Sequence, residues 1–322
     1  MRETETTVAA GDGTLLAGTL TLPAEQGPHP AVLLLHGSGP LDRNGNTAKL
    51  VLDLGQPLAR SLAAAGIATL RYDRRGAGAT PGDWRAAGFT DNRQDAIAAL
   101  YTLAAHPDVR SDAVGVIGHS EGALHAMALA AHPEVRAAVL LAGFARSGEG
   151  AMRKQASSVF SGMPAPIRLF RRPLGALGNR ALARIKRTRT DVARVLGLPM
   201  NARWMREMLV HDTRDDLVAV RAAVLAVTGD KDIQVPPADL ATIKSLVPGG
   251  RAEVHRVQDL THVLRRDPAR HTIRSYRRLL RDPVDPELLD LVTGWLTRRL
   301  GTPSGEAPAG TGTRDPGGRT HP

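Results

Sequence analysis

Residues 113–122, with the sequence Ala-Val-Gly-Val-Ile-Gly-His-Ser-Glu-Gly, decide the fold of this chain. The first five form a short apolar run, typical of a strand buried on both faces of a sheet. The last five fit the pattern G-x-S-x-G, which between a strand and a helix is typical of a sharp, strained turn. The turn would raise the Ser120 hydroxyl above the carboxyl edge of the sheet, where the first amides of the helix also point. A simpler interpretation makes Ser120 an ordinary helix N-cap.

Apolar runs and helical segments alternate on both sides of this turn. Four more runs are typical of buried strands, at residues 31–35, 67–72, 137–142 and 222–228. Helices are predicted at residues 48–65, 91–105, 121–131, 237–246 and 286–300. Residues 14–22 alternate polar and apolar side chains and predict an edge hairpin with residues 6–10. The order of these elements predicts an α/β fold with a mostly parallel central sheet and helices on both faces.

The charge of the chain is concentrated in one segment. The 322 residues include 42 Lys plus Arg against 32 Asp plus Glu, a formal net charge of +10. Residues 146–215 hold 13 Arg and 2 Lys against 5 acidic residues, which accounts for the whole excess. This segment also breaks the alternation of strands and helices. We therefore expect a core of residues 1–145 and 216–300, a strongly basic helical cap at 146–215, and a disordered Gly/Pro-rich tail at 301–322.

Composition also excludes several functions. The chain has no cysteine, which rules out disulfide scaffolds, thiol catalysis and cysteine-ligated zinc. Aromatic residues make up only 3%, so a basic surface without stacking platforms argues against nucleic-acid binding. The polar start and the lack of a long apolar run predict a cytoplasmic protein with no transmembrane segment. The glycines of residues 76–82 lack the spacing of a nucleotide-binding loop.

A second chemical signal follows the apolar run at residues 31–35. His36-Gly37-Ser38-Gly39 places two glycines at a strand end, where backbone amides can converge on an oxyanion. The expected pair of donors is the N–H of Ser38 and the N–H of Glu121. The sequence leaves Gly37 and Gly39 open as the first donor.

An acid and a base are expected on later loops. Asp232 follows the run at 222–228 and lies further into its loop than Asp230, so it is preferred as the acid. His262 follows a strand-like segment at residues 252–257 and is preferred as the base over His255 and His271. No cluster with metal-ligand spacing accompanies these residues, so no metal or other cofactor is expected.

The order Ser120, Asp232, His262 is the nucleophile–acid–base order of α/β hydrolases, and the chain resembles that superfamily over about residues 10–300. It is most similar to bacterial dienelactone-hydrolase-like and serine-aminopeptidase-like esterases. Two stretches carry the finer match, His36-Gly37-Ser38-Gly39-Pro40-Leu41-Asp42-Arg43-Asn44-Gly45-Asn46 and Tyr72-Asp73-Arg74-Arg75-Gly76-Ala77-Gly78. The resemblance implies an α/β-hydrolase fold, Ser120 as nucleophile, Asp232 as acid and His262 as base. It implies that the second stretch supports the floor of the site.

The resulting functional hypothesis is a serine hydrolase that cleaves a small-molecule carboxylic ester through an acyl-enzyme on Ser120. The arginines of the cap either form a solvated face, with their stems over apolar neighbours, or attract anionic esters. A serine aminopeptidase and an acyl thioesterase use the same chemistry and remain alternatives. A catalytically silent α/β-hydrolase fold that serves as a binding module is the alternative of another class. The sequence does not predict the oligomeric state.

Overall fold

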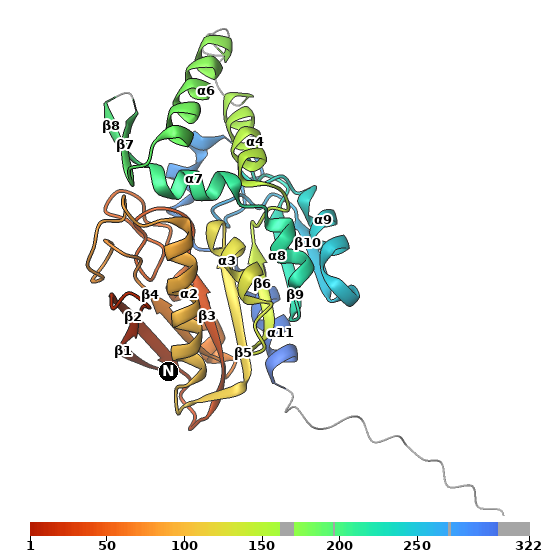
Figure 1. Cartoon of the computed structure of the whole chain (residues 1–322). Coiled ribbons are helices and arrows are strands. Elements are labelled where there is room, and N and C mark those ends of the chain that lie inside the picture. Colours follow the sequence, from red (N-terminus) through yellow and green to blue (C-terminus); the bar gives the residue numbers. More distant parts are fainter. Residues whose placement is uncertain (162–170, 196, 270–271, 302–322) are drawn as a thin grey trace, which may run out of the picture.

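An eight-stranded sheet runs through the computed structural model, which describes residues 1–161, 171–195, 197–269 and 272–301 (Figure 1). Its strands are β1 (Arg2–Ala9), β2 (Leu15–Leu22), β3 (His29–Leu35), β4 (Ala68–Tyr72), β5 (Val109–His119), β6 (Val135–Leu141), β9 (Ala223–Gly229) and β10 (Ala252–Val257). They lie in the order β1-β2-β4-β3-β5-β6-β9-β10. Only the β1–β2 and β2–β4 pairs are antiparallel, so the mostly parallel sheet and the N-terminal edge hairpin are confirmed.

Helices cover both faces of this sheet. On one face lie α1 (Gly55–Ala64) and α11 (Pro286–Leu300), and on the other α2 (Phe89–Ala104), α3 (Glu121–Leu129), α8 (Thr213–Ala219) and α9 (Asp239–Leu246). Successive residues of β3 divide between the two cores, because side chains alternate across a strand. Leu33 and Leu35 join the α2–α3 core, whereas Val32 and Leu34 join the α1–α11 core. Three short helices lie in the C-terminal part of the described chain, outside the segment 146–215: η1 (Pro248–Gly250), η2 (Ile273–Ser275) and α10 (Tyr276–Leu279).

Helix α1 begins later than its sequence predicts. Residues 48–54 are not helical, and the helix starts at Gly55. The amides of Leu54 and Gly55 both donate to the backbone carbonyl of Asn44, and Asp53 has a left-handed φ of 44°. The backbone of this segment is therefore bonded to the loop after β3 instead of to itself.

Of the segment 146–215, the described residues as far as 210 stand above the carboxyl edge of the sheet (Figure 1). The segment contains α4 (Gly148–Ser161), α6 (Arg171–Arg187), β7 (Val192–Val195), β8 (Leu198–Asn201) and α7 (Ala202–Val210). Its two ends lie together, because the amide of Gly148 donates to the carbonyl of His211 at 2.8 Å. On this arrangement we propose that the segment is a cap on the core. The tail predicted at 301–322 lies outside the described residues except for Gly301.

The β7–β8 hairpin adds strands to a segment in which the sequence predicts only helices. Each strand has four residues, and Gly197 turns between them with a φ of 81°. Strands this short, one of them containing Pro199, leave no apolar run by which to recognise them.

Among the described helices, none has the length and apolar character required to cross a membrane.

Strand β5 passes into α3 through the sharp turn expected at Ser120. Ser120 has φ 56° and ψ −118°, an uncommon conformation for a residue with a side chain. Gly118 and Gly122 lie where backbones meet: a Cβ on Gly118 would overlap the carbonyl of Gly122, and a Cβ on Gly122 would overlap the carbonyl of Leu35. The turn therefore requires both glycines, and the tight contact between α3 and β3 places Ser120 at the carboxyl edge.

We predict that Gly122→Ala lowers the free energy of unfolding by about 2 kcal/mol or more, because strand β3 cannot yield to the added methyl group. Urea unfolding followed by circular dichroism measures the change. Gly175→Ala in α6 is the matched control, since nothing lies within 4 Å of its added Cβ. The control variant should be as stable as the parent or slightly more stable. Equal stability of the two variants would contradict the close approach at Gly122.

Candidate active site

Ser120, Asp232 and His262 lie in one chain of hydrogen bonds at the carboxyl edge of the sheet. Nε2 of His262 is 3.1 Å from Oγ of Ser120, and Nδ1 of His262 is 2.8 Å from Oδ2 of Asp232. The carboxylate holds the proton on Nδ1 and leaves Nε2 free to accept the serine proton. Asp232 and His262 are 8% and 6% exposed, so water competes little for these bonds. The structure thus brings together the three residues that the sequence predicts for the site.

The rejected alternatives lie elsewhere or have other partners. Oδ1 of Asp230 accepts the amide of Asp259 at 2.7 Å and thereby ties the loop after β9 to the loop after β10. Oδ1 of Asp232, in contrast, accepts the amides of Gln234 and Val235, which fixes its other oxygen towards His262. His255 lies on β10 and bonds to the carboxylate of Glu253 on the same strand. His271 lies outside the described residues.

Two buried imidazoles hold the loops of the site, and sequence analysis missed both roles. Nε2 of His119 donates to the backbone carbonyl of His262 at 2.8 Å, and Nε2 of His36 donates to the carbonyl of Arg43 at 2.7 Å. Burial lowers the pKa of His119 to about 3 and that of His36 to about 4, so both rings are neutral donors at neutral pH. The only sequence signal is that each histidine directly follows the apolar part of a strand.

The loop after β3 packs directly against Ser120. A Cβ on Gly37 would lie 3.4 Å from Cβ of Ser120. Within the described part of the chain, the amides of Glu121 and of Gly37, Ser38 and Gly39 donate no hydrogen bond, so all three residues of the loop stay open as the first donor. An oxyanion requires two such unpaired amides, one from this loop and one from the residue after the nucleophile.

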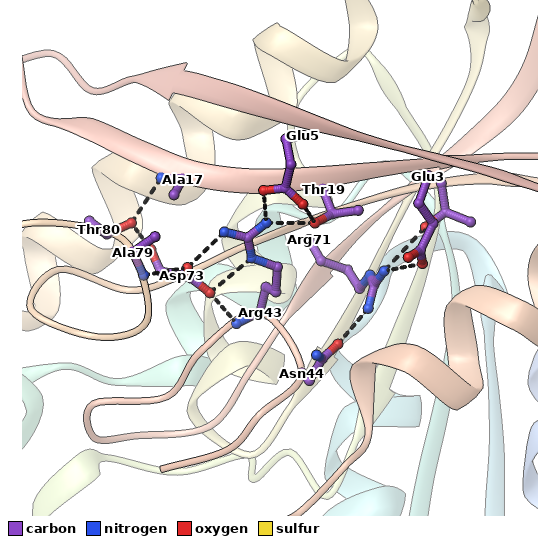
Figure 2. A network of polar contacts seen from close by, with 11 residues as sticks. Glu3, Glu5, Ala17, Thr19, Arg43, Asn44, Arg71, Asp73, Ala79 and Thr80 are labelled. Atoms are coloured by element: carbon purple, nitrogen blue, oxygen red, sulfur yellow. Dashed lines mark hydrogen bonds and ion pairs between the residues drawn. The ribbon is translucent and has the colours of Figure 1, made fainter. Parts of the chain in front are cut away.

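A buried ion network anchors this loop to the N-terminal strands (Figure 2). The backbone amide of Arg43 donates to Asp73 at 2.7 Å, and its guanidinium makes a two-pronged contact with the same carboxylate. The guanidinium also reaches Glu5 and Thr19 on β1 and β2. Because the Asp73 side chain is only 3% exposed, it depends on Arg43 for its charge balance.

A second arginine extends the network into the sheet. Arg71 on β4 is 2% exposed and donates to the side chains of Asn44, Glu3 and Thr21 (Figure 2). Burial lowers the pKa of Arg71, and the charge of Glu3 opposes that effect. The loop is therefore held at Arg43 and Asn44 by residues of three strands. The stretch 72–78 contributes Asp73 to this support.

The carboxylate of Glu121, the residue after Ser120, collects donors from four elements. Oε1 accepts from Arg74 at 2.8 Å, from Asn92 at 3.0 Å and from His125 at 3.1 Å. Oε2 accepts from Nε1 of Trp204, on cap helix α7, at 3.0 Å. Burial alone would raise the pKa of Glu121, but the charge of Arg74 and the bond from His125 together lower it well below its usual range. The side chain is therefore a buried anion that fixes its own backbone amide and contacts the cap.

Metal-ligand geometry is not part of this arrangement. Across the residues that the structure describes, no group of three or more His, Asp and Glu side chains is placed to hold a metal ion. The chemistry that the geometry offers is proton transfer from a serine to a histidine next to a pair of amides.

Comparisons with known proteins identify relatives of this chain. A family model described as serine aminopeptidase, S33, matches residues 50–269. Esterase EstD of Thermotoga maritima is 26% identical over 292 residues, which cover 88% of this chain and 66% of EstD. The chain therefore spans just under two thirds of the length of that curated relative.

Solved structures show the same fold at low sequence identity. Esterase PF2001 of Pyrococcus furiosus aligns with a TM-score of 0.61 and 16% identity, over 93% of this chain and 92% of that one. Est1E of Butyrivibrio proteoclasticus, solved with ferulic acid bound, gives 0.62 and 17%, over 92% and 100%. The α/β hydrolase GrgF of a Penicillium species gives 0.63 and 16%, over 94% and 100%. The eight-stranded sheet is thus that of an α/β hydrolase.

The neutral histidines predict how stability depends on pH. The pKa of His119 is about 3 in the folded chain and near its ordinary value of 6.5 in the unfolded chain. Between these values the unfolded chain binds more protons, so the free energy of unfolding falls as the pH drops from 6.5 towards 3. His119→Gln should make the slope shallower by about 1.4 kcal/mol per pH unit, the effect of one proton. Urea unfolding between pH 4 and 6.5 measures the slope, and His36→Gln should change it in the same direction. An unchanged slope in both variants would contradict their neutral burial.

The ion network predicts a local effect on the loop after β3. Arg43→Met should lower the free energy of unfolding by about 3 kcal/mol, because it leaves the buried Asp73 carboxylate without its partner. Amide hydrogen exchange in residues 37–46 should accelerate more than exchange in β5. Arg180→Met, at an exposed position on α6, is the control and should alter neither quantity. Uniform acceleration across the sheet would mean that Arg43 stabilises the whole fold and not this loop.

Proposed function

The chain belongs to the S33 serine aminopeptidase family of α/β hydrolases, and from that premise we propose that it is a carboxylic ester hydrolase that works through an acyl-enzyme on Ser120. The observation that carries the proposal is the bonded series Ser120–His262–Asp232, with contacts of 3.1 and 2.8 Å. The family description names a peptidase, whereas the curated relative is an esterase. The match to that esterase favours an ester over a peptide as the substrate of this chain.

In the first half of the reaction His262 acts as general base. Nε2 takes the proton from Oγ of Ser120 as the oxygen attacks the ester carbonyl carbon. The amides of Ser38 and Glu121 donate to the oxygen that gains the negative charge. The carboxylate of Asp232 stabilises the imidazolium and keeps its Nδ1 proton in place. When the intermediate collapses, Nε2 gives its proton to the alkoxide that leaves, and Ser120 remains acylated.

Water completes the cycle by the same steps. His262 removes a proton from water as its oxygen attacks the acyl carbon, and the amides again bind the oxyanion. The proton then returns from Nε2 to Oγ of Ser120, the carboxylic acid departs, and the enzyme is restored. His119 serves as a positioning residue, because its bond to the carbonyl of His262 holds the loop that carries the base.

The proposal predicts covalent labelling at one serine. A fluorophosphonate probe should label the protein at Ser120 and should leave Ser120→Ala unlabelled, as read by mass spectrometry. Ser120→Ala and His262→Ala should each lower turnover of p-nitrophenyl acetate by roughly 10⁴-fold to 10⁶-fold. His255→Ala is the matched control, since that histidine bonds only to Glu253 and should leave turnover unchanged. A wild-type protein that no probe labels would be a binding module and not a hydrolase.

A substrate panel distinguishes the related chemistries. We expect p-nitrophenyl esters to be cleaved with a higher kcat/KM than aminoacyl p-nitroanilides or acyl thioesters of the same acyl group. Faster cleavage of the anilides would identify an aminopeptidase, and faster cleavage of the thioesters a thioesterase. Both results would retain Ser120 as nucleophile and replace only the substrate class.

A further inference from the structure

We propose that a cavity beside the oxyanion loop binds the acyl group of the ester and selects an uncharged, apolar group that contains an aromatic ring. The inference rests on the proposed ester hydrolysis and adds the substrate class. The cavity has a volume of about 280 Å³ and lies between the core and the cap. Its walls include Ser38 and Gly39 from the core loop, Trp84 from the loop before α2, and Met200, Trp204 and Met205 from the cap.

The cavity lies beside the loop that packs against Ser120. Ser38 and Gly39 line it, and Gly37 of the same loop packs against Ser120. Trp204, which also lines it, donates to the carboxylate of Glu121, the next residue after Ser120. A group attached to a carbonyl carbon above Ser120 can therefore enter the cavity without passing His262.

The acyl group, and not the alcohol, faces this cavity. His262 must protonate the leaving alkoxide, so the alcohol has to lie on the His262 side of the carbonyl carbon. The acyl substituent points away from that side. None of the lining residues comes from the loops after β9 and β10, which carry Asp232 and His262.

The polar side chains in the wall are directed at other protein groups. Arg74, Asn92 and Trp204 line the cavity, and each of them donates to the carboxylate of Glu121. The positive charge of Arg74 is therefore balanced by a buried anion that is 4% exposed. A carboxylate or phosphate on the acyl group would have to compete with that ion pair.

Two further polar residues of the wall, Arg75 and Asn201, are paired as well, which leaves the small hydroxyl of Ser38 as the other polar group. Arg75 bonds to the carboxylates of Asp95 and Asp12. The amide group of Asn201 donates to the carbonyls of Trp84 and Ala87 and accepts the amide of Trp204. Besides these paired groups, the cavity offers a ligand the rings of Trp84 and Trp204 and the thioethers of Met200 and Met205.

The charge of the cap lies outside the cavity. The cap residues that line it are Pro199, Met200, Asn201, Trp204 and Met205, and none is charged. The exposed cations of the cap include Arg172, Arg180, Arg184 and Arg187 on α6. They can attract an anion towards the protein, but they do not select the acyl group.

The size of the cavity sets the size of the group. An apolar cavity of about 150 Å³ is enough to hold benzene. A volume of about 280 Å³ accommodates a ring with two or three further carbons. Indole faces and methionine sulfurs both interact favourably with aromatic rings, so an arylalkanoyl group fits better than a straight chain.

The test compares three p-nitrophenyl esters on the full chain: acetate, 3-phenylpropanoate and the glutarate half-ester, whose acyl group ends in a carboxylate. We expect kcat/KM to be at least about tenfold higher for 3-phenylpropanoate than for acetate, and lowest for the glutarate.

Ala87→Phe adds a ring to the cavity wall and should lower the ratio of kcat/KM for phenylpropanoate to kcat/KM for acetate at least tenfold. Ala87→Leu is a milder second variant that should lower it less. Ala241→Phe, on the exposed side of α9, is the matched control and should keep the ratio.

The outcomes separate the two levels of the proposal. If the wild type cleaves none of the esters and no probe labels Ser120, the proposed function fails. If it cleaves acetate at least as well as phenylpropanoate, or prefers the glutarate, the acyl-cavity inference is overturned while ester hydrolysis stands. Equal losses on acetate and phenylpropanoate in both Ala87 variants, with Ser120 still labelled by the probe, would also overturn it.

Discussion

The buried carboxylate of Glu121 joins three parts of this molecule that meet at Ser120. It accepts from Arg74 in the loop after β4, from Asn92 on α2 and from Trp204 on the cap. The charge balance inside the acyl cavity and the seating of α7 both depend on it, and its own backbone amide is one of the two proposed oxyanion donors. An uncompensated carboxylate at 4% exposure would be very costly, so these donors have to remain in place together. The cap at α7 is for this reason coupled to the chemistry beneath it.

Much of the fold could be predicted because the sheet is buried on both faces. Strands such as β5 and β6 then appear as short apolar runs, and residues that follow them, including Ser120, fall at one edge. Residues whose roles depend on distant partners could not be found in this way. His119 acts on a carbonyl 143 residues away, and Glu121 on an indole 83 residues away. The β7–β8 hairpin and the late start of α1 were missed because backbone contacts, not side-chain patterns, determine them.

Net charge and binding chemistry are separate properties of the cap. The sequence locates the +10 in residues 146–215, and the structure exposes arginines of that segment on α6. The surface that the cap presents to the cavity consists of Met200, Trp204 and Met205, with neutral neighbours. Composition can therefore locate a charge on a segment, but only the packing of α7 and β8 shows which face of that segment lines the cavity.

The edge strand β1 has a role that its position does not suggest. Edge strands at a chain end are often dispensable, because few contacts hold them. Here Glu3 and Glu5 reach inward to Arg71 and Arg43, the arginines that hold the loop after β3 (Figure 2). Trimming the first few residues, or pulling them out of register with a fused partner, would leave Arg71 without its carboxylate partner and Arg43 with Asp73 alone. The pairing of β1 with β2 is thus a condition for a well-ordered loop after β3, some 35 residues later in the chain.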